Sequence, residues 1–509
     1  MTPELIPRPR FVEYLSGEVT WVSPLLVAVE SDWRGVVESF ASDLGRAIGW
    51  DVTVVAPGEA CDVEILRLPE LDGEGYQISV AACTQVEAST EAGVAYALTT
   101  LRQLGPDALW SNTRRDLHEI VIPCVIVQDA PAFTWRGAHL DVARHFFDVE
   151  VVCRLIDQLA AHRLNSLHLH LNDDQGWRVE IPSWPLLTEI GATRRSSPVG
   201  HEGGVDDHVA HGGFFNAEDL LTIRERAARR FIQIVPEIDL PGHAQAAIAA
   251  YPELGNVSEP LEVWTNWGIS EHVLNVSADA IRFAVDVVLY VASLFPKSPV
   301  HIGGDECPTI EWANSPAALA VMSEHGFRER RELQGLFTKA ISAALQGAGH
   351  EVVAWDEVLD AEVLPGTIIA AWRSSAKGVA AAERGLDVVM AAMQFLYFDW
   401  LSSDDPAEPV AVAPVPHVTT WEKVYGFSVI PPGLRPNLDH HIRGAQAQLW
   451  TEYIATEEHL DYMAFPRLAA FSEVVWGTAT NVDEFRPRLR AHLGRLDAMG
   501  VEYRTLDGE

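Results

Sequence analysis

The sequence predicts an α/β protein: a (β/α)8 TIM barrel preceded by a small α+β domain. From about residue 133, short apolar runs alternate with longer amphipathic segments, and about eight such runs occur, which is the strand number of this barrel. Nearly every run ends in polar or aromatic residues, as expected where barrel strands meet at one rim. A doubly wound open sheet is the alternative, but no glycine-rich phosphate turn follows the first run. We therefore expect domains of 1–130 and 131–509.

The N-terminal region combines strand-like runs with a helix. Three runs have the composition of strands: 25–30, 51–56 and 76–82. Residues 90–104 carry apolar side chains at helical spacing. No obvious polar constellation lies in this region, so we look for chemistry in the barrel.

Each expected barrel strand ends in side chains suited to a site. The strands are expected at 138–144, 166–173, 232–239, 300–306, 351–357, 367–373, 387–399 and 445–452. Their endings are Arg144–His145, Asn172–Asp174, Glu237–Asp239, Asp305–Glu306, Trp355–Glu357, Trp372–Arg373, Tyr397–Asp399 and Trp450–Glu452. Together they predict a large polar site with aromatic walls.

Helices and long loops fill the remaining sequence. Helices are expected at 149–162, 216–230 and, at the C-terminus, 485–500. The long loops 194–213, 251–272 and 402–417 could shape a substrate pocket or decorate the surface, and the sequence leaves both open.

Composition excludes several classes of partner. The 509 residues carry a formal charge of −35, which disfavours nucleic acid and anionic membranes. No apolar run is long enough to span a bilayer. The five cysteines lack any C-x-x-C pair and fit free thiols in a reducing compartment. With no signal-type apolar segment at the N-terminus, we expect a cytoplasmic protein, unless a signal has been removed. The oligomeric state stays open.

Metal and nucleophile chemistry find little support in the motifs. His168 and His170 share one face of a strand, as in some metal-dependent amidohydrolases, but the later strands do not end in further histidines. No G-x-S-x-G motif is present. Cys307 directly follows Glu306, whose carboxylate raises the thiol pKa and disfavours a thiolate. We expect no metal and no cofactor.

Carboxylates and aromatic residues are the remaining candidates, and they suit a carbohydrate. Aromatic planes match the C–H faces of a sugar, and charged side chains match its hydroxyl groups. Taken singly, each of Trp355, Trp372, Trp421 and Trp450 is better explained as a core residue, and only their combination with polar endings favours a site. An ordinary glycosidase needs two carboxylates on opposite sides of the scissile bond. Asp305 and Glu306 are adjacent in an expected strand and would point to opposite faces, so they do not fit that arrangement. A substrate with a 2-acetamido group could instead supply its own nucleophile.

Several segments resemble family 20 glycoside hydrolases, the β-N-acetylhexosaminidases. HIGGDE at 301–306 resembles the family signature. The other matching segments occur in family order: 140–147, 167–178, 235–243, 354–358, 449–452 and 461–476. Residues 74–104 resemble the family's small N-terminal domain. The resemblance covers most of the chain.

The resemblance implies a retaining, substrate-assisted mechanism and a role for each matched residue. Glu306 would be the general acid and later the base, and Asp305 would hold the acetamido N–H and stabilise an oxazolinium-type intermediate. Tyr397 would donate to the acetamido oxygen, and Trp355, Trp372 and Trp450 would wall its pocket. Arg144, Asp399 and Glu452 would bind sugar hydroxyls. Asp173 and His243 would support Glu306.

The expected activity is release of terminal non-reducing β-GlcNAc from an oligosaccharide or glycoconjugate, with β-GalNAc as a further possible substrate. Chitooligosaccharide turnover is a plausible setting. The alternatives are a lacto-N-biosidase-like enzyme that releases a disaccharide, a metal-dependent amino-sugar amidohydrolase and a non-catalytic sugar-binding barrel. Linkage, aglycone preference and any role of Trp421 in the site stay open.

Overall fold

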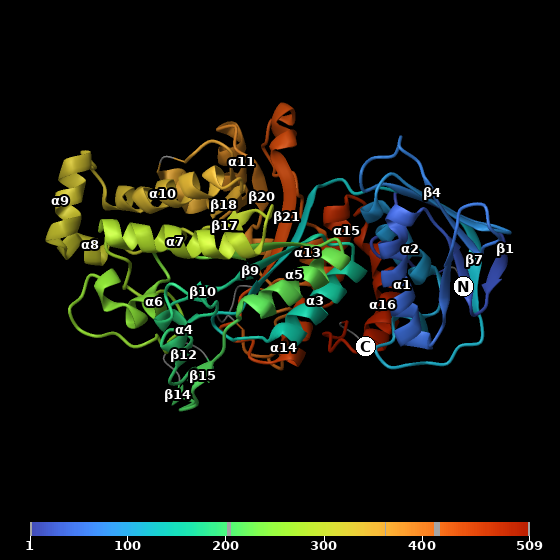
Figure 1. Ribbon diagram of the computed structural model, residues 1–509, viewed down its shortest axis with the longest axis horizontal. Coiled ribbons are helices and arrows are strands. Elements are labelled where there is room, and N and C mark those ends of the chain that lie inside the picture. The colour runs from blue at the N-terminus through green and yellow to red at the C-terminus, as the bar shows by residue number, and fades with distance from the viewer. Residues whose placement is uncertain (1–2, 201–204, 362, 412–417, 507–509) are drawn as a thin grey trace.

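The computed structural model describes residues 3–200, 205–361, 363–411 and 418–506 (Figure 1). Its N-terminal part is a mixed seven-stranded sheet in the order β1-β7-β5-β6-β4-β2-β3. The strands are β1 (Phe11–Trp21), β2 (Leu25–Ala28), β3 (Val52–Val55), β4 (Val63–Arg67), β5 (Tyr76–Val80), β6 (Thr84–Ala88) and β7 (Ile120–Asp129). The helical segments are η1 (Ser31–Trp33), α1 (Arg34–Ile48), α2 (Glu91–Leu104) and η2 (Asp107–Trp110).

The strands and the helix expected in this part are all present, but α1 and the four strands β1, β4, β6 and β7 were not predicted. The long pair β1–β7 shows one reason. Pro123 lies inside β7, and proline within an apolar run argues against a central strand. Pro123 pairs with Glu18 next to a shift in register, an irregularity that accommodates a residue without an N–H.

The eight expected barrel strands close into a parallel barrel in the order β16-β17-β18-β19-β20-β21-β8-β9. Their bounds are β8 (Trp135–Asp141), β9 (Ser166–His170), β16 (Gln233–Glu237), β17 (Val300–His301), β18 (Val352–Trp355), β19 (Thr367–Ala371), β20 (Val388–Met390) and β21 (Ile442–Leu449). The predicted fold, a TIM barrel after a small α+β domain, is confirmed.

Two strands are much shorter than expected, and both differences bear on the site. The strand expected at 300–306 ends at His301, because Gly303 and Gly304 adopt positive φ angles of 62° and 96° that a strand does not allow. Asp305 and Glu306 therefore lie in a loop, and the expectation of alternating faces was wrong. The strand expected at 387–399 ends at Met390 and is followed by the short helix α12 (Met393–Leu396).

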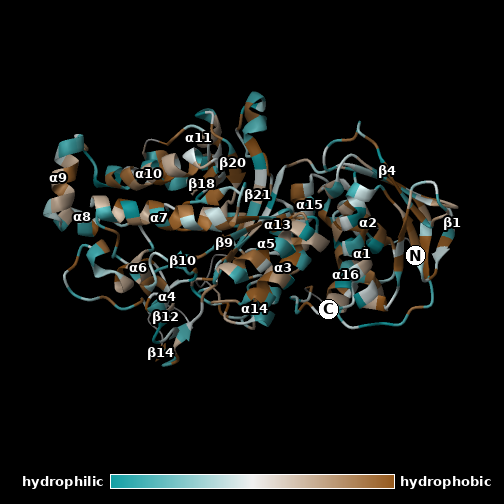
Figure 2. Ribbon diagram, viewed as in Figure 1, coloured by the Kyte–Doolittle hydropathy of each residue, from teal (hydrophilic) through white to brown (hydrophobic). Residues whose placement is uncertain are grey.

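Most barrel strands are followed by a covering helix, which buries one face against the sheet. The main helices are α3 (Val149–Ala161), α5 (Ala217–Arg229), α7 (Ala278–Leu294), α10 (Gln334–Gly347), α11 (Ser375–Glu383), α14 (Glu457–Ala464), α15 (Arg467–Trp476) and α16 (Val482–Met499). In Figure 2, hydrophobic and hydrophilic residues alternate along α3, α7 and α10, as expected for helices with one buried face. The expected helices at 149–162, 216–230 and 485–500 correspond to α3, α5 and α16.

Short elements decorate the loops between the barrel strands. They are β10 (Asn172–Asp173), β11 (Gly176–Trp177), α4 (Leu186–Glu189), β12 (Thr193–Arg194), β13 (Pro198–Val199), β14 (Val205–Asp206), β15 (His211–Gly212), α6 (Gln245–Ala250), η3 (Pro252–Leu254), α8 (Ile310–Asn314), α9 (Pro316–His325), η4 (Arg330–Leu333), η5 (Asp356–Asp360), α13 (Trp421–Tyr425) and η6 (Pro436–His441). The end of the long loop expected at 402–417 lies outside the described residues. No helix among the described residues is long and apolar enough to cross a membrane.

The N-terminal sheet is fixed to the barrel through the C-terminal helices and buried ion pairs. Figure 1 shows α16 beside α1, between the barrel and the N-terminal sheet. Trp476 at the end of α15 packs in the N-terminal core and donates its indole N–H to Asp129 at 2.9 Å. Arg163, before β9, forms a fully buried ion pair with Asp129 at 3.1 Å. The two cores are therefore joined by polar contacts that exclude water.

A further ion cluster at this junction leads to a stability prediction. Asp43 on α1 is buried and pairs with Arg46, Arg102 and Arg230, the last of which comes from the barrel. Although burial opposes its charge, these arginines lower the pKa of Asp43 to about 2. We expect Asp43→Asn to reduce the free energy of unfolding by about 3 kcal/mol at pH 7, because three arginines lose their shared carboxylate.

Denaturant unfolding of Asp43→Asn beside the unmodified chain measures this effect. The folded-state pKa is depressed, so the stabilisation is present above the unfolded value of about 4 and fades as the pH falls toward 2. The difference between the two proteins should therefore shrink below about pH 4. Asp32→Asn, which removes an exposed partner of Arg67, should cost less than about 1 kcal/mol. Equal stability of Asp43→Asn and the unmodified chain at pH 7 would contradict this interpretation.

Candidate active site

The loop after β17 presents the two adjacent acids, and its glycines set their position. A Cβ atom on Gly303 would lie 1.9 Å from Oδ1 of Asp239, so only glycine lets the loop approach this carboxylate. The backbone N–H of Gly304 donates to the same Oδ1 at 2.8 Å. Glu306 follows with a positive φ of 48°, which is unusual for a residue with a side chain and typical of functional loops. The loop is thus anchored on Asp239, at the end of the neighbouring strand β16.

Asp305 is a buried acid facing another acid. Burial raises its pKa well above the usual value, and the negative charge of Asp239 adds to this effect while His243 opposes it. Burial likewise raises the pKa of Asp239 to about 7. Oδ1 of Asp305 has no hydrogen-bond partner within the described part of the chain. Burial and this pairing of like charges therefore favour the protonated form of Asp305, and a ligand N–H could satisfy the free oxygen.

Glu306 is the more accessible acid. Its side chain is 38% exposed, against 12% for Asp305. Nε2 of His243 lies 3.9 Å from Oε2 of Glu306 and 4.0 Å from Oδ2 of Asp305. The His243 imidazole thus faces both acids. Of the two acids, the exposed Glu306 is the one that can contact the leaving group of a bound substrate and a water molecule.

Asp173, in the loop after β9, organises the charges around these acids. Its Oδ1 accepts from Nδ1 of His243 at 3.0 Å, and its Oδ2 lies 2.9 Å from Arg144 Nη2. Although burial disfavours an imidazolium, Asp173 raises the pKa of His243 well above its usual value. Although burial disfavours a carboxylate, Arg144 and His243 hold the pKa of Asp173 well below its usual value. The result is a buried cation at His243 aimed at the two acids.

Arg144 and the acids Asp399 and Glu452 form a second polar group. Arg144 Nε donates to Gln175 at 3.0 Å, and Nη2 lies 4.0 Å from Oε1 of Glu452. Burial raises the pKa of Asp399 and of Glu452, with the charge of Glu452 adding to the effect on Asp399. Oδ1 of Asp399 and Oε2 of Glu452 are buried with no partner among the described residues. Unsatisfied buried oxygens are costly, so these two atoms suit the hydroxyl groups of a ligand.

Aromatic rings connect the two polar groups. Trp450 lies under the Arg144 guanidinium at 5.0 Å and 6.4 Å from the Tyr397 ring. Trp372 stacks on Tyr397 at 6.0 Å. Trp355 lies 6.1 Å from Trp450 and is almost fully buried. The structure thus brings the predicted site residues into one network on the barrel rim.

Histidines beneath this network explain the H-x-H motif on β9. Glu237 receives the indole N–H of Trp355 at 2.9 Å, and His168, His170 and His301 surround it. The motif therefore places imidazoles around a buried carboxylate that fixes a tryptophan.

Among the described residues, three groups of side chains lie close enough to hold a metal by distance alone: His139–His168–Glu237, Asp173–Asp174–His243 and Asp239–His243–Asp305. His243 belongs to the last two groups, and its Nδ1 already forms a hydrogen bond with Asp173 at 3.0 Å.

Three residues outside the predicted set complete the site. They are Gln175, which orients Arg144; Asp239, which anchors the acidic loop; and Glu357, whose Oε2 accepts from Trp372 Nε1 at 2.9 Å. Burial, with the charges of Asp305 and Asp356, raises the pKa of Glu357 to about 8. Asp239 and Glu357 were visible in the sequence as strand endings, whereas nothing local distinguished Gln175.

The structure also places the residues whose role the sequence left open. Trp421 packs on Phe485 at 5.8 Å and under Arg486 at 4.8 Å, so its ring is part of the C-terminal core. The loop 251–272 and the described part of the loop 194–213 contact the segment after β8, whereas residues 201–204 lie outside the described residues. Arg194 donates to the Arg144 carbonyl at 2.6 Å, and Trp267 lies 5.4 Å from the His145 ring. These two loops therefore support the Arg144 side of the site.

Two family models match the chain. The model described as "Glycosyl hydrolase family 20, catalytic domain" matches residues 133–479, and "Glycosyl hydrolase family 20, domain 2" matches residues 2–130. The chain is 37% identical to a β-hexosaminidase of Porphyromonas gingivalis over 88% of its own length, and spans 56% of that relative's length. It is 33% identical to a β-N-acetylhexosaminidase of Cellulomonas fimi, covering 98% of this chain and 95% of the relative.

Solved structures agree with these relatives. The chain superposes on a family 20 exo-β-N-acetylglucosaminidase of Vibrio harveyi, in complex with N-acetylglucosamine, with a TM-score of 0.86 and 31% identity. That match covers 98% of this chain and 78% of the other. A family 20 β-N-acetylhexosaminidase of Streptomyces coelicolor superposes with a TM-score of 0.84 and 29% identity, covering 99% of this chain and 97% of the other.

Proposed function

This chain belongs to glycoside hydrolase family 20, and we propose that it is an exo-acting β-N-acetylhexosaminidase that removes terminal non-reducing β-GlcNAc with retention of configuration. The observation that carries this proposal is the set of buried unpartnered oxygens on Asp305, Asp399 and Glu452 around the Trp372–Tyr397–Trp450 wall. Relatives named for hexosaminidase activity support it, as does the related Vibrio harveyi structure in complex with N-acetylglucosamine.

We propose that the 2-acetamido group of the substrate is the nucleophile. Glu306 protonates the glycosidic oxygen as the acetamido oxygen attacks the anomeric carbon and the bond to the leaving group breaks. Asp305 accepts the acetamido N–H, and its negative charge stabilises the oxazolinium ring that forms. Tyr397 donates its O–H to the acetamido oxygen and orients it. Glu306 then removes a proton from water, which attacks the anomeric carbon, opens the ring and restores the acetamido group.

The cation at His243 has a definite part in this cycle. It lies 4.0 Å from Asp305 and 3.9 Å from Glu306, and its charge favours the ionised form of Asp305. Asp305 must be ionised when the intermediate forms, and Glu306 must be ionised when water attacks. Asp173 keeps the imidazole charged and oriented, which makes both residues positioning groups for the two acids.

Hydrolysis of a chromogenic β-GlcNAc glycoside, followed by NMR of the first anomer released, tests the proposed function. We expect cleavage with the β-anomer of GlcNAc formed first. Release of the α-anomer would contradict the substrate-assisted reaction. A lacto-N-biose glycoside distinguishes the disaccharide-releasing alternative, which would cleave it in preference to the GlcNAc glycoside. Loss of activity on treatment with a chelator would favour a metal-dependent amidohydrolase instead.

The paired acids give a prediction for the pH profile. After burial, the charge of Asp239 is the largest cause of the raised pKa of Asp305. The acid limb of kcat/KM reports a group that must be ionised in the free enzyme, here Asp305. Asp239→Asn removes the like charge and thus lowers the pKa of Asp305, so the acid limb should move to lower pH. The amide oxygen can still accept the Gly304 N–H. An acid limb that stays in place or moves to higher pH would contradict the role given to this pair.

A further inference from the structure

A cavity of about 370 Å³ lies between the N-terminal domain and the barrel, away from the rim. Helices α1 and α2 and the end of η2 form one side, and α3, the end of α5 and the end of α16 form the other. None of the residues assigned to the reaction lines it. The volume falls in the range of small-molecule sites.

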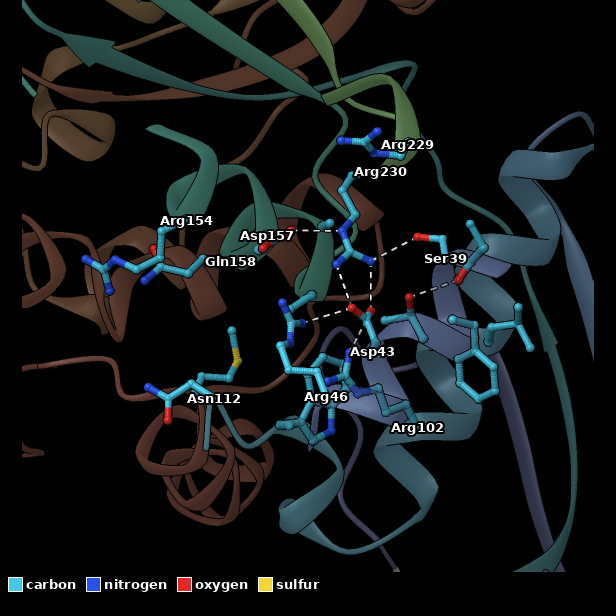
Figure 3. Close-up of a pocket in the computed structure, with 18 of the residues that line it drawn as sticks. Ser39, Asp43, Arg46, Arg102, Asn112, Arg154, Asp157, Gln158, Arg229 and Arg230 are labelled. Atoms are coloured by element: carbon cyan, nitrogen blue, oxygen red, sulfur yellow. Dashed lines mark hydrogen bonds and ion pairs between the residues drawn. The ribbon is translucent and has the colours of Figure 1, made fainter. Parts of the chain in front are cut away.

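Arginine side chains gather at this cavity. Figure 3 shows the guanidinium groups of Arg46, Arg102 and Arg230 directed at the Asp43 carboxylate. The distances to Asp43 are 2.9 Å from Arg46, 3.1 Å from Arg102 and 2.8 Å from Arg230. Arg230 also pairs with Asp157 at 2.8 Å, and Asp157 is shared with Arg226. Four arginines therefore share two carboxylates.

This excess of positive charge is unusual for the molecule. The whole chain carries a formal charge of −35, yet arginines outnumber acids in this cluster, in which Asp43 is buried and the Arg46 side chain is 48% exposed. Arg102 is 10% exposed and Arg230 is 15% exposed, so water screens their charges only weakly. A bound anion would relieve the repulsion among the guanidinium groups.

Hydrogen-bonding groups remain available in the cavity. Among the described residues, Arg46 pairs with Asp43 through Nη2 alone, which leaves its other N–H groups for a ligand. Asn112 is an exposed residue that lines the cavity, so its side-chain amide can also meet a ligand. Ser39 lies beside Arg230, and its hydroxyl is a further donor. Arg46 thus gives the cavity a charged end that can bind an anionic group, and Asn112 and Ser39 give it a polar wall.

We propose that this cavity binds a phosphate monoester of a small hydroxylated molecule, such as a sugar phosphate. The planar guanidinium groups suit the phosphate oxygens, which accept paired N–H donors. Five arginines line the cavity against the three acids Asp43, Asp157 and Glu457, and a phosphate dianion matches this excess of two positive charges. Asn112 and Ser39 bind hydroxyl groups of the organic part. Because the lining comes from both domains, the bound ligand holds the N-terminal domain on the barrel and stabilises the folded chain by mass action.

Calorimetric titration and thermal unfolding of the full chain test the proposal, with glucose 6-phosphate as the probe. Inorganic phosphate and glucose serve as comparison ligands at constant ionic strength. We expect saturable binding of glucose 6-phosphate, binding of inorganic phosphate that is at least about tenfold weaker, no binding of glucose, and a Tm that rises with glucose 6-phosphate concentration. Absence of saturable binding up to about 10 mM, or equal affinity for the two phosphates, would overturn the proposal.

Two variants locate the site. Arg46→Gln should weaken binding of glucose 6-phosphate by at least about tenfold, because a charge-assisted bond is lost. Asn112→Ala should weaken it about threefold while leaving the arginine cluster intact. The matched control is Arg34→Gln, which removes the same charge from α1 at an exposed residue outside the cavity. It should bind as the unmodified chain does. Unchanged affinity in Arg46→Gln, or an equal loss in Arg34→Gln, would place the binding elsewhere and refute the site.

Discussion

Glu306→Gln should reduce kcat/KM for an oligosaccharide such as chitobiose by about 10² to 10⁴-fold, without a change in fold. The amide cannot give a proton to the glycosidic oxygen, so a sugar leaving group departs as a poorly stabilised alkoxide. The side chain is 38% exposed, and the loop is held by the Gly304 N–H on Asp239, so the substitution should leave the structure intact. Steady-state kinetics together with circular dichroism measure both effects.

The leaving group provides the internal control for Glu306→Gln. A dinitrophenyl β-GlcNAc glycoside carries a stable phenolate leaving group that needs little protonation. Its kcat/KM, which reports the first irreversible step, should therefore fall far less than that of chitobiose. An equal fall for both substrates would show that Glu306 does not act as the acid, and near-normal activity on chitobiose would remove it from catalysis altogether.

Asp305→Asn should also cause a large loss, on the order of 10² to 10³-fold in kcat/KM, and for a different reason. An asparagine has nearly the same shape, but it carries no negative charge to place beside the oxazolinium cation. It can also turn its NH₂ group toward the acetamido N–H, and an NH₂ group repels this N–H instead of accepting a hydrogen bond from it. Because Oδ1 of Asp305 has no partner among the described residues, the loss should come from the ligand contact and not from a damaged fold.

Binding measurements separate this role from a general structural one. A thiazoline mimic of the cyclic intermediate should bind Asp305→Asn much more weakly than it binds the unmodified chain. Free GlcNAc lacks the positive charge of the intermediate, so its affinity should fall less. Unchanged affinity for the thiazoline would refute the proposed contact between Asp305 and the acetamido group.

The sequence was sufficient to predict the barrel and the residues of its rim, because both follow from local patterns. The polar endings of the eight apolar runs indicate which side chains reach the rim. The rim residues could therefore be predicted without exact strand bounds. The short strand β17 shows the limit. A strand was expected through Gly303 and Gly304, whereas the loop they form rests on Asp239, which lies 65 residues from Gly304 in the sequence. Contacts of that kind depend on the closed barrel.

Other features depended on tertiary contacts in the same way. Nothing near Gln175 in the sequence indicates that it orients Arg144, and Trp421 could not be separated from the site until its packing on Phe485 was known. The N-terminal sheet was incompletely predicted because β1 and β7 form an irregular pair around Pro123. The arginine cluster on Asp43 assembles from α1, α2 and the end of α5, which no local motif unites.

The central claim is that the acetamido group of the substrate is the nucleophile, and one comparison tests it directly. The measurement is kcat/KM for 4-nitrophenyl β-GlcNAc against 4-nitrophenyl β-glucoside, which differ only in the 2-substituent. An intramolecular nucleophile contributes a large effective molarity, so the glucoside should be cleaved at least about 10³-fold less efficiently. Comparable cleavage of the two glycosides would contradict substrate assistance and require a nucleophile from the protein.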